Sequence, residues 1–123
     1  MKWKLHIVAF LITCFASAQV TFEAKVSKKK LGVNERLRID FVMNKDGDNF
    51  TPPNFENFTI VGGPSQTIST QWLNGVKKSS KTFSYFLAPK KRGKFTIGQS
   101  TIEIDGEIYK TVPVTIEVTA AID

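Results

Sequence analysis

The sequence predicts an all-β protein: an immunoglobulin-like antiparallel β-sandwich of about seven or eight short strands, preceded by a signal peptide. Three observations support this fold class. After residue 18, apolar residues alternate with polar ones along most of the chain, turn-forming residues recur roughly every 8 to 12 positions, and no segment has a helical period. Each alternating strand has one apolar face, so two layers of strands must cover each other.

Residues 1–18 have the organisation of a secretory signal peptide. Lys2 and Lys4 precede the apolar run 7–15, which ends at the small residues Ala16-Ser17-Ala18. The run is too short to cross a bilayer, which needs about 20 residues. We therefore expect a signal peptide at 1–18, cleavage before Gln19, and one domain at 19–123.

Cleavage would remove the only Cys and the only His of the chain, Cys14 and His6. The remaining domain would then lack the residues for a disulfide, a Ser-His-Asp or Cys-His triad, or a Cys/His zinc site. The formal charge would fall from +6 to +4, because Lys2 and Lys4 are lost as well. The composition thus favours a domain that an apolar core stabilises, and it disfavours an enzyme.

The first half of the domain contains two strands and a long connection. Alternation over 20–26 predicts the first strand, which ends at the polar run 27–30, and stronger alternation over 37–43 predicts the second. The range 44–57 contains Gly47, Pro52 and Pro53 among polar residues, so we expect a connection there rather than a central strand.

A hairpin is predicted in the middle of the chain. Apolar residues resume at 55–60 and stop at Gly62-Gly63-Pro64, after which a polar strand leads to Asn74-Gly75, a dipeptide typical of a type I′ turn. The return strand over 80–87 places Phe83, Tyr85 and Leu87 on one face, and the basic turn 89–93 follows it.

The range 93–118 carries the longest alternating pattern and predicts two or three further strands. Ile102 and Ile104 lead into Asp105-Gly106, a second hairpin turn. Phe95 and Ile97 are apolar at odd positions, so we expect an inserted residue in a bulge or bend at 98–100. The apolar face is expected to continue at even positions after the turn, namely at Ile108, Val112, Val114, Ile116 and Val118.

No catalytic, cofactor-binding or metal-binding residue is expected. The polar loop 44–49 resembles a calcium loop, but Asn49 stands where the turn glycine is required and Phe55 where the closing glutamate belongs. The acidic residues near Asp105 flank a hairpin turn, where charges are usually solvated. We interpret both groups as polar turns and expect no small-molecule substrate.

Two basic turns, 28–30 and 90–92, support an alternative function. They could attach a secreted module to envelope polysaccharide or to anionic lipid, and such binding would weaken as salt is added. No aromatic residue is interleaved with these charges, so nucleic acid is not an expected partner.

The range 65–71 is the segment that we favour as an interaction site. It contains no charged residue and no proline, the residues that commonly protect a sheet edge from pairing with another chain, and its polarity predicts an edge strand. The pattern leaves open whether Trp72 is the core tryptophan of the sandwich or an exposed aromatic residue near the turn. The candidate interaction residues are Thr67, Ser69, Gln71, Trp72, Asn74 and Gly75.

An ordered set of short motifs resembles the N-terminal domain of the BatD family, which is associated with oxygen tolerance (aerotolerance). The resemblance extends over essentially all of 19–123. The motifs are Val20-Thr21-Phe22-Glu23-Ala24, Pro53-Asn54-Phe55, Phe58, Ile60, Gly63-Pro64, Asn74-Gly75, Tyr85-Phe86-Leu87-Ala88-Pro89, Gly93-Lys94-Phe95-Thr96-Ile97-Gly98, Gly106-Glu107-Ile108-Tyr109 and Pro113-Val114.

This resemblance implies an exported protein of Gram-negative bacteria with immunoglobulin-like domains in the periplasm. It also implies further domains and a membrane anchor, so the chain would be a fragment or a short form of a protein tethered to the inner membrane. The implied partners are membrane proteins with von Willebrand factor A domains, near a MoxR-type ATPase, and further domains of its own full-length protein. We thus expect a non-enzymatic periplasmic module for protein interaction.

Overall fold

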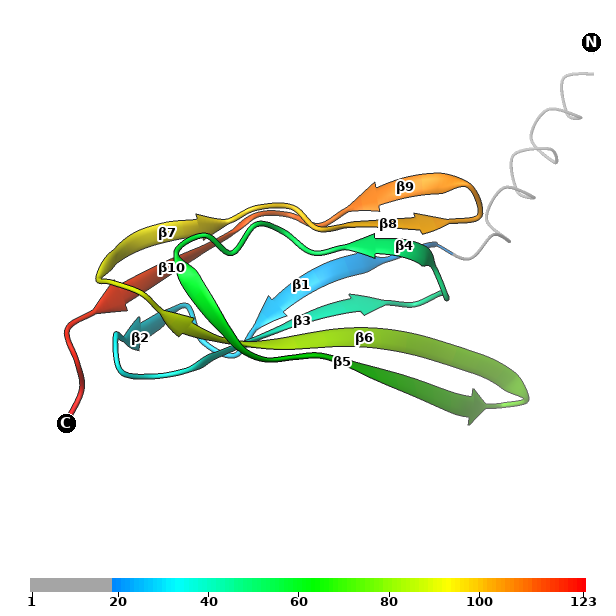
Figure 1. Ribbon diagram of the computed structural model, residues 1–123. Helices are drawn as coiled ribbons and strands as arrows, with labels where there is room; N and C mark the ends of the chain where they lie inside the picture. Colours follow the sequence, from blue (N-terminus) through cyan, green and yellow to red (C-terminus); the bar gives the residue numbers. More distant parts are fainter. Residues whose placement is uncertain (1–18) are drawn as a thin grey trace, which may run out of the picture.

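The computed structural model describes residues 19–123, so the predicted signal peptide lies outside the described residues. These residues form two layers of β-strands (Figure 1) and contain no helix. The first layer is a four-stranded antiparallel sheet in the order β1-β3-β6-β5. Its strands are β1 (Phe22–Val26), β3 (Leu37–Met43), β5 (Phe58–Leu73) and β6 (Val76–Pro89).

The second layer consists of two three-stranded sheets that follow each other along the molecule (Figure 1). One has the order β2-β10-β7 and the other the order β4-β8-β9. The pairing of β2 with β10 is parallel, and the other pairings are antiparallel. The strands are β2 (Lys30–Gly32), β4 (Asp48–Thr51), β7 (Gly93–Ile97), β8 (Thr101–Ile104), β9 (Glu107–Lys110) and β10 (Val114–Thr119).

The ten strands form the predicted immunoglobulin-like arrangement when each interrupted strand is counted once. β7 and β8 are two halves of one long strand, and β9 and β10 are two halves of the strand that returns beside it. β2 continues β1 after a bend, but it pairs in the opposite layer. Counted in this way, four strands of one layer face three of the other, with β2 added at an edge, as in a constant-type sandwich. The predicted fold class is confirmed.

The break in the long hairpin differs from the expected single insertion. Ile97 pairs with Val114 and Thr101 pairs with Lys110, so the register does not shift across the three residues between these pairs on each strand. Within the break, one backbone bond remains, from the Thr111 N–H to the Ser100 carbonyl at 3.0 Å. At the break, the buried Ser100 donates its N–H to Thr111 Oγ1 at 2.9 Å and its hydroxyl to the Thr51 carbonyl at 2.7 Å. Both strands bend together, so each changes its buried parity without an inserted residue.

The core lies between the two layers. Its centre contains Leu37, Ile39 and Phe41 of β3 together with Leu87, Ile102 and Ile116, all at most 1% exposed. Val118 is buried and Val114 is half-buried, as expected, but Ile108 and Val112 are 59% and 78% exposed, so their predicted burial was wrong.

The reason lies in the turn of the hairpin. A two-residue turn pairs even-numbered with odd-numbered residues, here Ile102 with Tyr109 and Glu103 with Ile108. Paired residues share a face of the sheet, so Ile108 lies on the outer face with Glu103. Val112 lies in the unpaired break, where it points to solvent.

Two short strands were missed in the sequence. β2 begins at Lys30, the last residue of the first basic turn, and β4 lies inside the expected long connection. Both are edge strands of three or four residues, and β4 ends before Pro52. Their pairing comes from distant partners, Glu117–Thr119 for β2 and β8 for β4, and such short segments carry little alternation of their own.

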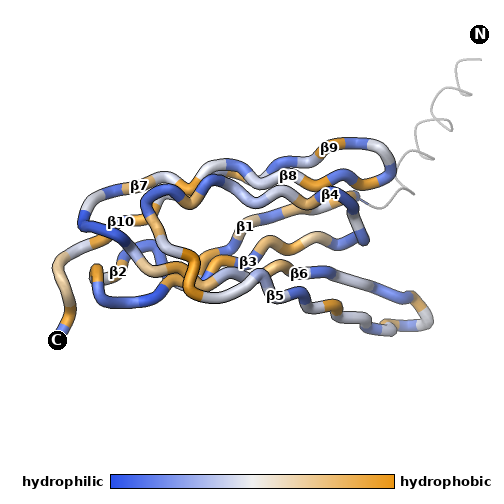
Figure 2. Tube along the Cα trace, in the orientation of Figure 1, coloured by the Kyte–Doolittle hydropathy of each residue, from blue (hydrophilic) through white to orange (hydrophobic). Residues whose placement is uncertain are grey.

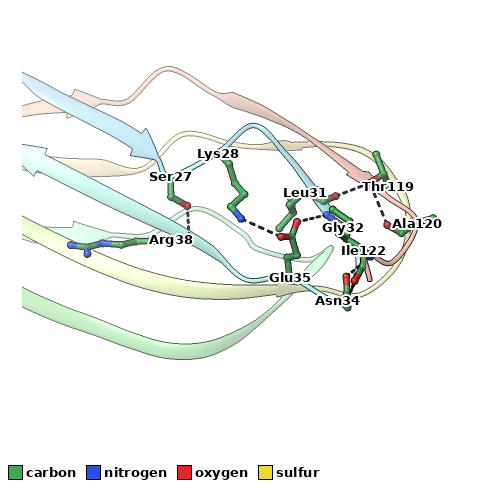
Figure 3. Close-up of polar contacts among 10 residues, drawn as sticks. All are labelled: Ser27, Lys28, Leu31, Gly32, Asn34, Glu35, Arg38, Thr119, Ala120 and Ile122. Atoms are coloured by element: carbon green, nitrogen blue, oxygen red, sulfur yellow. Dashed lines mark hydrogen bonds and ion pairs between the residues drawn. The ribbon is translucent and has the colours of Figure 1, made fainter.

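Side-chain hydrogen bonds fasten the connection between β2 and β3 (Figure 3). Glu35 accepts the Gly32 N–H at 2.8 Å, and Lys28 lies 3.6 Å from its other carboxylate oxygen. These contacts lower the pKa of Glu35, with the Gly32 hydrogen bond as the largest cause. The Asn34 side-chain amide makes two hydrogen bonds, of 2.7 and 2.9 Å, with the backbone of Ile122 and so holds the segment after β10.

Candidate functional site: the free edge of β5

The β5–β6 hairpin extends beyond the end of β3 in its own layer (Figure 1). Pairing of β6 with β3 ends at Lys81 and Met43, and the hairpin continues as a two-stranded ribbon. We call residues 69–80 the arm. Figure 2 shows β6 changing from hydrophobic within the sandwich to largely hydrophilic in the arm. Residues 77–80 of β6 therefore offer no apolar side chain that would tie the arm to the core.

The tip of the arm is the predicted hairpin turn. Asn74 and Gly75 both have positive φ, 50° and 78°, and connect Leu73 to Val76. Two central residues with positive φ define the type I′ turn, whose twist matches that of the strands. The prediction of a hairpin at Asn74-Gly75 is confirmed.

β5 is an edge strand of the four-stranded sheet, as the uncharged range 65–71 predicted. We call residues 65–73 the β5 edge. Before this range, between Ile60 and Ser65, the register of β5 against β6 shifts twice. In a β-turn the N–H after the turn donates to the C=O before it, here Val76 to Leu73. Backbone groups alternate in direction along an antiparallel strand. The backbone groups of Gln66, Ile68, Thr70 and Trp72 therefore point away from β6 toward the open side.

The structure places the candidate residues in two different roles. Thr67, Ser69 and Gln71 pair with Thr82, Ser80 and Lys78, so their backbone groups bond to β6 and their side chains lie on the outer face of the ribbon. Trp72 lies on the opposite face and is 68% exposed, so it is a surface tryptophan and not the core one.

The residues that offer free backbone groups were partly missed. Gln66, Ile68 and Thr70 were not among the candidates, although alternation counted back from the Asn74-Gly75 turn identifies them. The signal was present in the sequence, because a type I′ turn sets both the register and the direction of each backbone group.

Exposed apolar side chains accompany the β5 edge. Ile68 and Trp72 lie opposite Lys81 and Lys77, on the face of β6 that further along carries the buried Tyr85 and Leu87. This inner face continues the core-facing side of the sheet, yet Ile68 is 64% exposed. Leu73 and Val76 add apolar surface at the tip, with 52% and 56% exposed. Apolar residues beside an unpaired strand are typical of a surface for protein contact.

The base of the arm is attached to the connection after β3. Lys81 Nζ lies 2.9 Å from Asp46 Oδ1 and 5.4 Å from the centre of the Phe83 ring. The Phe83 ring stacks on that of Phe50, with 4.3 Å between the ring centres. A shallow groove of about 780 Å³ lies between this connection, the β8–β9 turn and the arm. Because the base is fixed, the β5 edge keeps a defined direction relative to the sandwich.

The comparison with protein families covers nearly all of this structure. Residues 24–118 match the family model described as the BatD DUF11-like domain. The chain belongs to the BatD family. The match extends from β1 into β10 and so includes the arm, which is part of the BatD domain. No curated protein matches the chain.

The described part of this BatD domain contains neither a group of side chains suited to a metal ion nor a membrane-spanning helix. Within residues 19–123, no three His, Cys, Asp or Glu side chains lie close enough together to hold a metal ion. In the calcium-like loop, Asp46 is paired with Lys81 and Asp48 begins β4. The same residues include no helix of sufficient length and apolar character to cross a membrane.

Proposed function

We propose that this BatD domain is a non-enzymatic periplasmic module that binds other proteins through the β5 edge and the tip of the arm. The observation that carries the proposal is the β5 edge itself. Between Ser65 and Leu73 it has unpaired backbone groups and no charge or proline, and the exposed Trp72 lies beside them. A domain that did not use such an edge would be expected to protect it.

The proposal includes location and partners. The signal peptide expected at 1–18 directs export, and the domain acts in the periplasm close to the inner membrane. The partners are membrane proteins with von Willebrand factor A domains, or further domains of the full-length BatD protein, and the function contributes to oxygen tolerance. Family membership supports these assignments.

A proline substitution at the free edge tests the proposal. Thr70 directs its N–H away from β6, so Thr70→Pro removes an edge donor without removing a bond between β5 and β6. Binding of the purified protein to the von Willebrand factor A domain of a neighbouring membrane protein is measured by calorimetry. We expect Thr70→Pro to weaken this binding at least about tenfold, because an added strand loses a hydrogen bond and its register.

Two further variants keep the test decisive. Thr70→Val retains the N–H and is expected to bind within about twofold of the parent, since its β-branched side chain suits a strand. Trp72→Ala leaves the backbone unchanged and should also weaken binding. It therefore provides the test even if Thr70→Pro fails to fold. Unchanged affinity in a folded Thr70→Pro and in Trp72→Ala would overturn the proposal. Binding that required the basic turns 28–30 and 90–92 instead would favour the anionic polysaccharide or lipid alternative.

A further inference from the structure

We propose that the β5 edge binds an extended segment of another protein in which apolar and acidic residues alternate, and that this segment pairs with Ser65–Leu73 as a fifth strand of the sheet. The inference rests on the proposed function and adds the chemistry of the partner. It follows from the distribution of charge around β5 and β6, together with the two different faces of the ribbon.

The charge around the ribbon has one sign. No Asp or Glu occurs between Asn57 and Ile102, whereas seven Lys and Arg residues do. Lys81 is paired with Asp46. The other six form no ion pair with any residue of 19–123: Lys77, Lys78, Lys90, Lys91, Arg92 and Lys94. The ribbon thus lacks acidic groups of its own to balance these cations.

Two of these cations lie directly behind the β5 edge. Lys77 pairs with Trp72 and Lys78 pairs with Gln71, so their side chains lie on the inner and the outer face, respectively. A strand added to β5 would run about 10 Å from β6, two strand spacings away. The extended side chains of a lysine and a glutamate together span that gap. An acidic residue on the outer face of the added strand can therefore pair with Lys78, and one on the inner face can pair with Lys77.

The two faces of the ribbon require different partners. On the inner face the added strand would meet Ile68 and Trp72, which are exposed and apolar. On the outer face it would meet Thr67, Ser69, Gln71 and the ammonium group of Lys78. Successive side chains of a strand point to opposite faces. A segment that alternates apolar and acidic residues satisfies both faces at once.

The same charges disfavour a second copy of this chain on the β5 edge. Two β5 edges placed side by side would bring together two cationic ribbons with no acidic residue in either. Like charges at close range cost free energy, and lysines near an edge are a common protection against self-pairing. An acidic segment has the opposite relationship to the ribbon, so its charge favours binding.

A pair of synthetic peptides tests the proposal. The probes are a fluorescent peptide of about nine residues that alternates Val and Glu, and its counterpart that alternates Val and Lys. We expect the Val-Glu peptide to bind the purified protein at least about tenfold more tightly in roughly 0.05 M salt, measured by fluorescence anisotropy. This preference should diminish in roughly 0.5 M salt, because salt screens exposed charges. Equal binding of both peptides at low salt would overturn the proposal.

Matched charge variants locate the site. Lys77→Gln/Lys78→Gln removes two charges behind the β5 edge, and Lys90→Gln/Lys91→Gln removes two from the β6–β7 turn at the opposite end of the sandwich (Figure 1). We expect the first variant to weaken binding of the Val-Glu peptide about three- to tenfold and the second less than about twofold. The reverse order, or equal effects, would overturn the proposal.

Hydrogen exchange distinguishes a paired strand from an anion held by charge alone. On binding of the Val-Glu peptide, the N–H groups of Gln66, Ile68, Thr70 and Trp72 should become protected, whereas those of Thr67, Ser69 and Gln71, already bonded to β6, should change less. Uniform or absent protection of these N–H groups would overturn the proposal. So would tighter binding of the protein to vesicles of phosphatidylglycerol than to the Val-Glu peptide. If the von Willebrand factor A domain still binds and Thr70→Pro still weakens it, the proposed function stands while this inference fails.

Discussion

Lys81 Nζ lies 2.9 Å from Asp46 Oδ1, and this contact joins the base of the arm to the connection between β3 and β4. The two partners differ in exposure, because the side chain of Lys81 is 17% exposed and that of Asp46 is 85% exposed. Since an exposed carboxylate is strongly solvated, the pair adds little to the stability of the domain.

The first prediction concerns this contact. Asp46→Asn should change the free energy of unfolding by no more than about 1 kcal/mol, since one partner is solvated. It should increase hydrogen exchange at Lys78 and Ser80, whose N–H groups bond to β5, because Lys81 at the base of the arm loses its partner. Asp48→Asn is the control, since Asp48 is exposed and forms no ion pair within 19–123. Equal exchange in the two variants would mean that the contact does not hold the arm.

The second prediction concerns the buried hydrogen bonds at the break of the long hairpin. Thr111→Val preserves the shape of the side chain but removes the acceptor for the Ser100 N–H, which is buried. We expect a loss of about 1 to 3 kcal/mol in unfolding free energy, seen as a lower melting temperature. Thr115→Val, at an exposed position of β10, should change it by about 0.5 kcal/mol or less. If Thr111→Val lost no more unfolding free energy than Thr115→Val, water would have to replace the hydrogen bond to the Ser100 N–H.

The third prediction compares two glycines of β5 and its turn. Gly63 and Gly75 have φ of +88° and +78°, a region that costs an L-residue roughly 1 to 2 kcal/mol. A methyl group at Gly75 would meet nothing within 4 Å, whereas one at Gly63 would collide with the Ser84 carbonyl oxygen. Chemical denaturation should therefore show a larger loss for Gly63→Ala than for Gly75→Ala. Equal losses would imply that β5 shifts to relieve the collision.

The fourth prediction concerns acid stability. The Gly32 N–H, followed by the charge of Lys28, lowers the pKa of Glu35 from its ordinary value of 4.5 against an opposing effect of burial. Because the pKa of Glu35 is lower in the folded state, its ionised carboxylate stabilises the fold. This stabilisation is fully present above the pKa of the unfolded state and is lost as the pH falls through the pKa of the folded state. Glu35→Gln should therefore show a smaller decline in melting temperature below about pH 4.5 than the parent. A steeper decline would contradict this assignment.

Local sequence predicted the features that depend on local geometry. Both hairpin turns were correct, because Asn74-Gly75 and Asp105-Gly106 accept positive φ whatever surrounds them. The edge position of the range 65–71 also followed from its composition, since a strand with one apolar residue, Ile68, gains little from a central place in a sheet.

Features that depend on distant partners were not predictable in the same way. β2 forms only because the C-terminal strand β10 lies beside it, and the exposure of Trp72 depends on how far the arm extends past β3. The exposed position of Ile108 was predictable, because the Asp105-Gly106 turn already requires an even residue to pair with an odd one. The direction of the backbone groups along the β5 edge was predictable for the same reason.

The parallel pairing of β2 with β10 has a mechanical consequence. The start of β1 and the C-terminus lie toward opposite ends of the sandwich (Figure 1), so tension applied through the two ends of the described chain pulls β2 and β10 in opposite directions along their length. Backbone bonds from Glu117 to Lys29 and from Val33 to Thr119 would then be loaded together in shear, and would have to break together rather than one after another. The domain should resist stretching along this axis far better than peeling of the arm, whose two strands can separate pair by pair from the Asn74-Gly75 tip.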